Sequence, residues 1–162
     1  MRPAKERGMS LVVARSELVV SASRRRIWEV LTDFPSYPDW NPLLREVHGE
    51  AQGGRSLNVR LAGFGHRGRN LWPDVLSANR ERELCLALAI LPAGLLDANW
   101  RVALIREAGG HCRIAQRVRC SGWLARWYAP RLARTLMPAL AAMNEALRLR
   151  AEADSPARLR RV

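Results

Sequence analysis

Residues 26–42 read RIWEVLTDFPSYPDWNP, and this segment predicts a short amphipathic helix followed by an aromatic turn. Apolar side chains spaced three, one and three residues apart fall on one helical face: Ile27, Val30, Leu31 and Phe34. Ser23 stands where an N-cap is expected, and Pro35 should end the helix begun at residue 24. Pro38 and Pro42 favour turns and extended backbone around Tyr37, Trp40 and Asn41.

Alternating apolar and polar residues predict β-strands on both sides of this segment. One strand precedes the helix and several follow the turn: residues 11–20, 44–50, 56–61, 71–78, 84–90, 98–107 and 112–121. A hairpin turn is expected at 52–55, a loop at 63–68 and a bend at 92–97, because these stretches are rich in glycine or proline. A helix followed by hairpins predicts an α+β domain.

The region from Leu124 to Ala153 predicts the longest helix of the chain. Its apolar residues recur mainly four positions apart, at Leu132, Leu136, Leu140, Met143 and Leu147. Pro138 interrupts this pattern, so the helix should either be kinked there or start again with Pro138 in its first turn.

With 162 residues, of which 48% are hydrophobic, the chain is predicted to form a single domain over residues 9–153. The basic segments 1–8 and 154–162 have little to bury and are expected to be disordered. The longest apolar run, 84–96, is too short to cross a bilayer, and the N-terminus lacks the apolar core of a signal peptide. A cytoplasmic protein is therefore expected.

The formal net charge of +12 comes almost wholly from arginine, because Lys5 is the one lysine. Arg113, Arg117 and Arg119 alternate with apolar residues and should face solvent. Such a surface attracts anions in general, so peripheral contact with anionic surfaces is possible, whereas the charge alone does not indicate specific binding of nucleic acid.

No motif of a metal site, cofactor site or catalytic centre is present in the sequence. Cys85, Cys112 and Cys120 show no paired spacing and are expected to be reduced and buried. The three histidines, at 48, 66 and 111, lie in separate strands or loops, so neither a metal nor another cofactor is expected. The carboxylates at 83, 97 and 107 fall at outward or turn positions, which argues against acid–base catalysis.

The sequence resembles the SRPBCC superfamily of START-like and birch-pollen-allergen-like proteins over nearly the whole chain, from about Leu11 to about Ala153. The matched segments, besides 28–42, are 72–75, 82–84, Gln116, 121–122 and 143–147. This resemblance implies a helix-grip fold: a curved antiparallel sheet of about six or seven strands around a long C-terminal helix, with two short helices after the first strand. It also implies an apolar cavity between sheet and helix.

Two positions differ from a pattern common in similar family members. Those proteins have a histidine and a glutamate where spacing places Trp100 and Val118 in this chain. The resemblance therefore implies a drier pocket without two candidate proton-transfer groups.

Twelve residues are predicted to bind a ligand because they fall on inward faces or in the aromatic turn: Trp40, Trp72, Leu86, Leu88, Trp100, Val102, Gln116, Val118, Leu136, Leu140, Met143 and Asn144. Trp40 and Trp72 could instead staple their turns to the sheet. Gln116 and Asn144 must find hydrogen bonds, either within the protein or from a ligand.

Three functions remain compatible with this sequence. The first is binding, and with it transport or sensing, of a hydrophobic or amphipathic small molecule such as a lipid. The second is an enzyme similar to polyketide cyclases and aromatases, in which Gln116, Tyr37 or Asn41 steers proton movement. The third is an interaction module that uses the arginine-rich surface. The sequence does not indicate the oligomeric state.

Overall fold

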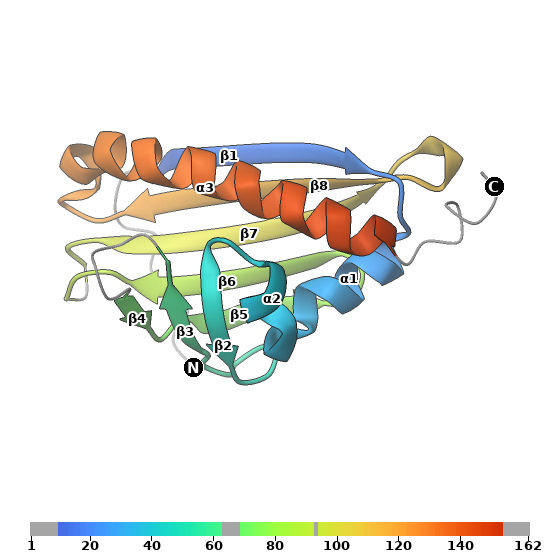
Figure 1. The fold of residues 1–162 in the computed structure, drawn as a ribbon. Helices are drawn as coiled ribbons and strands as arrows, with labels where there is room; N and C mark the ends of the chain where they lie inside the picture. The colour runs from blue at the N-terminus through green and yellow to red at the C-terminus, as the bar shows by residue number, and fades with distance from the viewer. Residues whose placement is uncertain (1–9, 63–68, 93, 154–162) are drawn as a thin grey trace.

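The computed structural model describes residues 10–62, 69–92 and 94–153, in which eight strands and three α-helices are arranged in two layers (Figure 1). The strands are β1 (Leu11–Val20), β2 (Leu44–His48), β3 (Asn58–Leu61), β4 (Arg69–Leu71), β5 (Asp74–Asn79), β6 (Glu83–Ala89), β7 (Asp97–Arg106) and β8 (Cys112–Ser121). The helices are α1 (Arg24–Thr32), α2 (Tyr37–Trp40) and α3 (Ala125–Ala153), with 3₁₀ turns at Phe34–Ser36 and Ala108–Gly110. The expected tails and the expected loop at 63–68, with its His66, lie outside the described residues.

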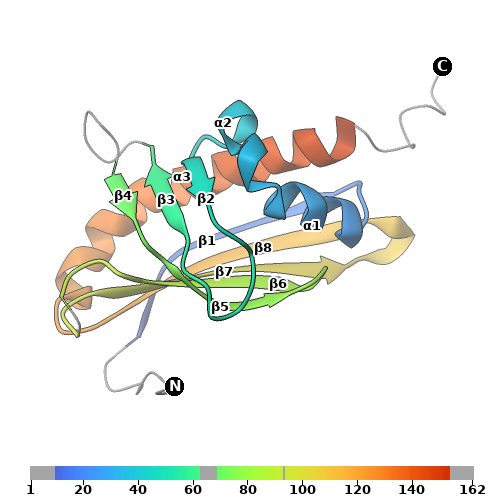
Figure 2. The ribbon, with the colours of Figure 1, turned by 90° about the horizontal axis from the view of Figure 1, so that it is seen from below.

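All strand pairs are antiparallel, and they form two hydrogen-bonded groups. Five strands follow the order β1-β8-β7-β6-β5, and three follow the order β2-β3-β4. Figure 2 shows the helices and the small sheet together on one face of the large sheet. This arrangement confirms the α+β helix-grip fold, with one or two more strands than expected.

The strand predicted at 71–78 is in fact divided between the two sheets. Leu71 ends β4 in the small sheet, and Asp74 begins β5 in the large one. Pro73 lies at the break because a proline has no backbone N–H to donate to a strand ladder. An isolated bridge between Ser56 and Asp74 keeps the two sheets joined at this corner.

The aromatic turn is helical, so the two short helices expected after the first strand are both present, and the prolines do not impose extended backbone around Tyr37 and Trp40. Helix α1 ends at Thr32, earlier than predicted, and is followed by the 3₁₀ turn and by α2. Pro35 and Pro38 occupy the first turns of these two short elements, where a missing N–H leaves no hydrogen bond unmade. The N-cap is confirmed, since Ser23 Oγ accepts a hydrogen bond from the Arg26 N–H at 3.2 Å.

Helix α3 is continuous from Ala125 to Ala153, so it does not start again at Pro138. Pro130 and Pro138 both lie within it on exposed positions. A carbonyl that loses its intrahelical partner on an exposed face can hydrogen-bond to water instead, which lowers the penalty for a proline.

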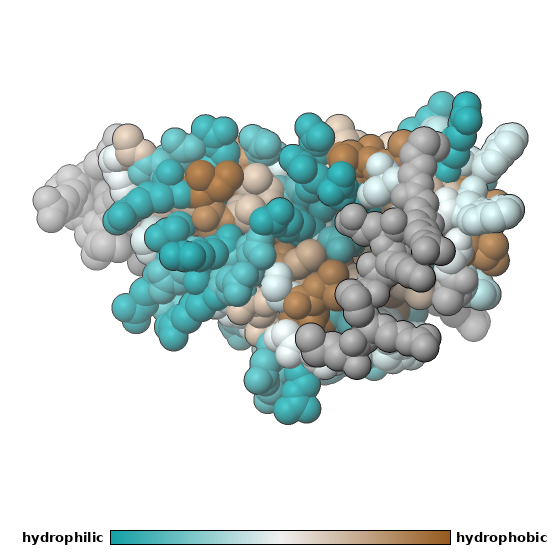
Figure 3. Space-filling view, turned by 180° about the vertical axis from the view of Figure 1, so that it is seen from behind, coloured by the Kyte–Doolittle hydropathy of each residue, from teal (hydrophilic) through white to brown (hydrophobic). Residues whose placement is uncertain are grey.

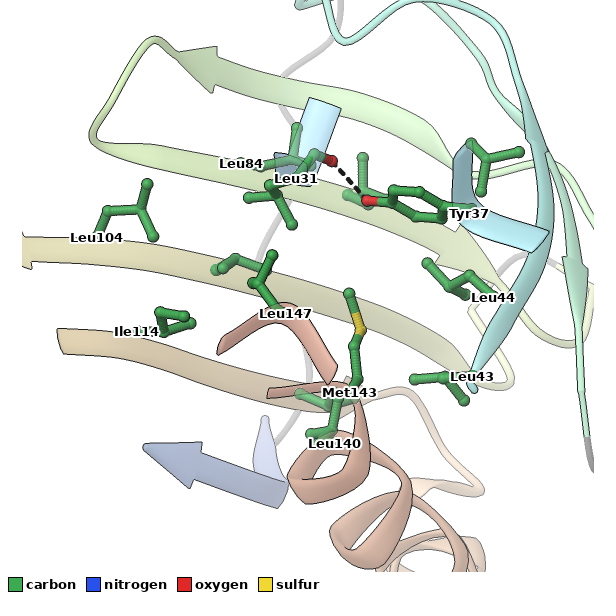
Figure 4. Close-up of a cluster of buried hydrophobic side chains, with 14 of the residues drawn as sticks. Leu31, Tyr37, Leu43, Leu44, Leu84, Leu104, Ile114, Leu140, Met143 and Leu147 are labelled. Atoms are coloured by element: carbon green, nitrogen blue, oxygen red, sulfur yellow. Dashed lines mark hydrogen bonds between the residues drawn. The ribbon is translucent and has the colours of Figure 1, made fainter. Parts of the chain in front are cut away.

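The core lies between the inner face of the large sheet, α1, α2 and the C-terminal part of α3. Figure 4 shows side chains from all of these elements, including Leu31, Leu84, Leu104 and Leu147, pointing toward one another. Tyr37 is buried in this cluster and donates a hydrogen bond from its hydroxyl to the Leu31 carbonyl at 2.5 Å. Burial raises the pKa of Tyr37 well above its ordinary value, so the phenol stays neutral.

Hydrophilic side chains cover much of the opposite face (Figure 3). Arg117 and Arg119 are exposed there, as predicted. Arg113 is half-buried instead, because its guanidinium pairs with Glu107 at 2.7 Å and with Glu17 at 3.7 Å. Among the described residues, no helix is both long enough and apolar enough to cross a membrane.

Candidate ligand-binding cavity

A cavity of about 160 Å³ lies where the two sheets and the N-terminal half of α3 diverge. The small sheet and its flanks form one wall, β6, β7 and β8 form the floor, and α3 forms the third side. The cavity is lined by Leu43, Leu44, Val59, Leu61, Leu71, Pro73, Leu86, Leu88, Ile90, Ala98, Trp100, Val118, Leu132, Leu136 and Leu140. All of these side chains are apolar apart from the indole nitrogen of Trp100.

A series of hydrogen bonds on the side away from the cavity holds the indole nitrogen of Trp100 in place. Trp100 Nε1 donates to Gln116 Oε1 at 2.9 Å, and Gln116 Nε2 donates to Asn144 Oδ1 at 2.6 Å. Asn144 Nδ2 then donates to Ser16 Oγ at 2.9 Å. The two buried amides therefore find their partners within the protein, and the cavity receives no polar group from them.

Trp100 and Val118 lie directly opposite each other on β7 and β8 and form part of the cavity floor. These are the two positions at which the sequence was expected to lack the histidine and glutamate of similar family members. None of the cavity-lining side chains is an acid or a base. A molecule in the cavity would be recognised by shape and apolar contact rather than by charge.

The structure brings six of the twelve predicted ligand-binding residues to the cavity: Leu86, Leu88, Trp100, Val118, Leu136 and Leu140. Four others are packed beside it: Val102 and Met143 are fully buried in the core, and Gln116 and Asn144 belong to the series of hydrogen bonds. That these twelve residues contact a ligand stays a prediction.

The last two predicted residues, Trp40 and Trp72, do not line the cavity. The Trp40 ring packs edge-on against Tyr37, with ring centroids 4.9 Å apart, and its Nε1 donates to Ser36 Oγ at 3.2 Å. Trp40 thus staples the helical turn. Trp72, at the break between β4 and β5, is 65% exposed, so it neither lines the cavity nor anchors the turn in the core.

The wall formed by the small sheet was missed by sequence reasoning. It supplies Leu43, Leu44, Val59, Leu61, Leu71 and Pro73. Alternation in β3 did place Val59 and Leu61 on an inward face, and this was the available signal. Nothing in the sequence indicated that this face would stand apart from the large sheet and leave a space.

The polar residues considered for a catalytic role are used in structural contacts. Asn41 Oδ1 accepts hydrogen bonds from the Leu43 and Leu44 N–H groups at 3.0 and 2.9 Å, which fixes the entry into β2. Tyr37 and Gln116 are engaged as described above, and none of these three side chains lines the cavity.

The three cysteines do not line the cavity. Burial raises the pKa of the Cys120 thiol to about 11 and also raises the pKa values of Cys85 and Cys112. Cys112 and Cys120 are buried as predicted, whereas Cys85 is half-buried and contacts Asn99. In the described part of the chain, no group of histidine, cysteine, aspartate and glutamate residues could hold a metal ion.

Several solved structures share this fold. A START superfamily protein from Mycobacterium smegmatis is 16% identical, with a TM-score of 0.67 over 90% of this chain and 99% of that one. Norcoclaurine synthase from Thalictrum flavum, in complex with dopamine and hydroxybenzaldehyde, is 17% identical, with a TM-score of 0.67 over 91% and 90% of the two chains. The di-domain ARO/CYC protein StfQ of the steffimycin biosynthetic pathway is 13% identical, with a TM-score of 0.71 over 88% of this chain and 52% of that one.

At these identities the structural matches show the fold alone. No curated protein is similar enough in sequence to count as a match. The model of one protein family, polyketide cyclase/dehydrase and lipid transport, matches residues 12–152, which is most of the chain. The chain therefore belongs to the polyketide cyclase/dehydrase and lipid transport family, within the SRPBCC superfamily inferred from its sequence.

Proposed function

We propose that the protein binds an apolar small molecule, or the apolar part of an amphipathic one, in the cavity between the two sheets and α3. The observation that carries this proposal is the apolar lining of the cavity. Its one polar side-chain atom, the indole nitrogen of Trp100, already donates a hydrogen bond to Gln116 and so is not left for a ligand. The family description, which includes lipid transport, supports the same class of ligand.

The size of the cavity limits what it can enclose. Its volume of about 160 Å³ is close to that of an engineered apolar protein cavity of ~150 Å³ that binds benzene. One ring or a short hydrocarbon segment would fit. Several lining residues are only partly buried, among them Leu61, Leu88, Ile90 and Leu132, so a longer molecule can extend past this rim.

A matched pair of substitutions on β7 tests the site. Ala98→Leu adds carbon atoms to a cavity-lining position, whereas Ala103→Leu adds them five residues along the same strand, on the opposite face of the sheet. We expect Ala98→Leu to weaken binding of an apolar fluorophore by about tenfold or more through steric exclusion, and Ala103→Leu to leave it unchanged. Equal affinities for the two variants would place the binding site elsewhere.

Native mass spectrometry of the freshly purified protein identifies what it holds. A hydrocarbon-rich molecule bound one to one, and absent from Ala98→Leu, would support the proposal and name the ligand class. A molecule that remains bound to Ala98→Leu, but is lost when Val118→Glu places an unpaired carboxylate in the cavity floor, would show that the occupied part of the cavity lies nearer β8.

A cyclase-like enzyme is the second candidate, because the family description names polyketide cyclases and dehydrases. In such a role the cavity would hold a reactive chain in a productive shape, and its apolar lining would exclude water. Since the lining residues supply no acid or base, proton transfer would depend on the substrate or on water. Recovery of a chemically changed ligand after incubation would favour this function, and recovery of the unchanged ligand would favour a carrier or sensor.

A further inference from the structure

Large aromatic side chains gather on the surface at the beginning of α3. Trp123 is 87% exposed and Trp127 is 79% exposed, although tryptophan is on average among the more buried residues. Tyr128 and Leu95 are exposed beside them. We call these four residues the tip cluster. Nothing in the cavity proposal accounts for them, because none lines the cavity.

Backbone contacts hold the tip cluster in place. The Trp123 and Leu124 N–H groups donate to the carbonyls of Gly94 and Leu95, at 3.3 and 3.0 Å. Gly122 has a φ of +111°, and a Cβ atom there would lie 2.5 Å from the Leu95 carbonyl oxygen. The connection from β6 to β7 and the connection from β8 to α3 are therefore in close backbone contact, and the exposed rings project from a fixed base.

The surface around the tip cluster is positively charged. Residues 118–144, from the end of β8 into α3, contain four arginines and no aspartate or glutamate. Arg126, Arg131 and Arg134 are exposed on the first turns of α3, and no ion pair is found for them in the part of the chain that the structure describes. The nearby carboxylate of Asp97, at the start of β7, pairs with none of the three.

Helical geometry puts the arginines on the same side of α3 as the tryptophan. Arg131 and Arg134 follow Trp127 by four and seven residues, so all three lie along one outward stripe. Leu132 and Leu136 point the other way and line the cavity. The same two turns of helix thus form a cavity wall on one face and an aromatic, cationic surface on the other.

We propose that the tip cluster and Arg126, Arg131 and Arg134 form a docking surface for anionic phospholipid membranes. Tryptophan and tyrosine side chains favour the membrane–water interface, where the ring is buried and its polar atom stays hydrated. Arginines beside them bind lipid phosphates, and the absence of carboxylates from residues 118–144 makes this surface complementary to the negative charge of such a membrane. This proposal does not depend on what the cavity holds.

Sedimentation with phosphatidylcholine vesicles, with and without phosphatidylglycerol, measures the docking directly. We expect the protein to bind the anionic vesicles and to be released by salt. Replacing Arg126, Arg131 and Arg134 together with serine should weaken binding on the order of a hundredfold, because each cation near an anionic surface contributes about fivefold. Trp123→Ser with Trp127→Ser should weaken it by about tenfold and remove the blue shift of tryptophan fluorescence that vesicles produce.

A second arginine triple provides the matched control. Arg80, Arg106 and Arg150 are also exposed, but they lie at the other end of the strands and of α3 (Figure 1). Serine at these three positions removes the same charge and should reduce vesicle binding far less than the α3 triple. Circular dichroism of each variant checks that the fold is retained, which is expected because all the substituted side chains are exposed.

Three outcomes would overturn the proposal. The first is an unmodified protein that does not bind anionic vesicles. The second is an equal loss of binding in the two arginine triples, which would show nonspecific attraction to a basic protein. The third is a concentration-dependent dimer, without vesicle binding, that Trp123→Ser and Trp127→Ser dissociate, which would assign the tip cluster to a second copy of the chain.

Discussion

The two halves of α3 differ in packing: the C-terminal half buries one face in the core, whereas the N-terminal half lines the cavity proposed to bind a ligand. In the C-terminal half, side chains exposed by 1% or less face the core: Leu140, Met143, Asn144, Leu147 and Ala151. Between Arg126 and Ala139, no residue is fully buried. One amphipathic helix can therefore be a packed core element along one stretch and a cavity wall along the next.

Charges follow the same division. Arg148, in the C-terminal half, pairs with Glu145 and, at 2.7 Å, with Glu152. Further toward the N-terminus, Arg131 and Arg134 form no such pair within the described residues. The half of the helix that lacks close packing also has uncompensated charge, and both properties suit a surface that binds other molecules.

The largest expected difference between the halves comes from truncating leucines. Leu147→Ala should lower the free energy of unfolding by about 2–5 kcal/mol, because Leu147 is fully buried and its removal leaves a void. Leu132→Ala should lower it by less than about 2 kcal/mol, since Leu132 is partly exposed beside an existing cavity. Urea unfolding of both variants measures the difference, and equal losses would remove the distinction between the halves.

The next test breaks the hydrogen bonds between Trp100, Gln116, Asn144 and Ser16, which lie at the boundary between the two halves of α3. Asn144→Ala removes the acceptor of Gln116 Nε2 and the donor to Ser16 Oγ, which should lower the unfolding free energy by about 1–3 kcal/mol. It should also loosen Trp100 and broaden the range of ligands bound, as a panel of fluorophores of different size would measure. Loss of stability with an unchanged ligand profile would show that these hydrogen bonds only stabilise the fold and do not shape the cavity.

Enlarging one leucine in each half sharpens the comparison. Leu147→Phe overfills a packed site and should lower the unfolding free energy by about 1–3 kcal/mol. Leu136→Phe extends into the cavity, so it should change stability by less than about 1 kcal/mol while reducing ligand affinity. Thermal unfolding together with fluorophore titration checks both effects. A Leu136→Phe variant that loses stability but binds normally would contradict the assignment of the cavity.

The smallest expected effect concerns the ion pairs of the C-terminal half. The hydrogen bond from Arg148 holds the pKa of Glu145 below its ordinary value of 4.5. The ionised carboxylate therefore stabilises the fold above about pH 4.5, and this contribution is lost as the pH falls through the lowered pKa. Glu145→Gln should unfold at a slightly lower temperature than the unmodified protein at pH 7. The gap should narrow in acid and in high salt, because the pair is exposed.

Sequence periodicity predicted the position of most strands and of α3, because strand and helix repeats show directly which residues share a face. It also placed Leu86, Leu88, Leu136 and Leu140 on faces that do line the cavity. It could not separate them from Val102, which shares an inward face but is buried in the core. The difference depends on what lies across from each side chain.

The tryptophans show the same limit. Trp40, Trp72 and Trp100 were all predicted to bind a ligand, with a staple of the turn as the alternative for the first two. In the structure, the first staples a turn, the second is mostly exposed and the third forms part of the cavity floor. The exposure of Trp123 and Trp127 has no local signature, because a tryptophan near the start of an amphipathic helix can equally be a core anchor.

The sequence by itself determined an α+β domain, the inward face of most strands and the absence of a recognisable catalytic motif, since these depend on local periodicity and on residue type. The helix-grip fold followed from the resemblance of the sequence to the SRPBCC superfamily. Tertiary structure alone decided where the small sheet leaves the large one, that Gln116 and Asn144 bond to each other, and which half of α3 is packed. The physical reason is that a cavity, a buried hydrogen bond and an exposed surface are each defined by pairs of residues far apart in the chain. Local sequence patterns specify only one member of each pair.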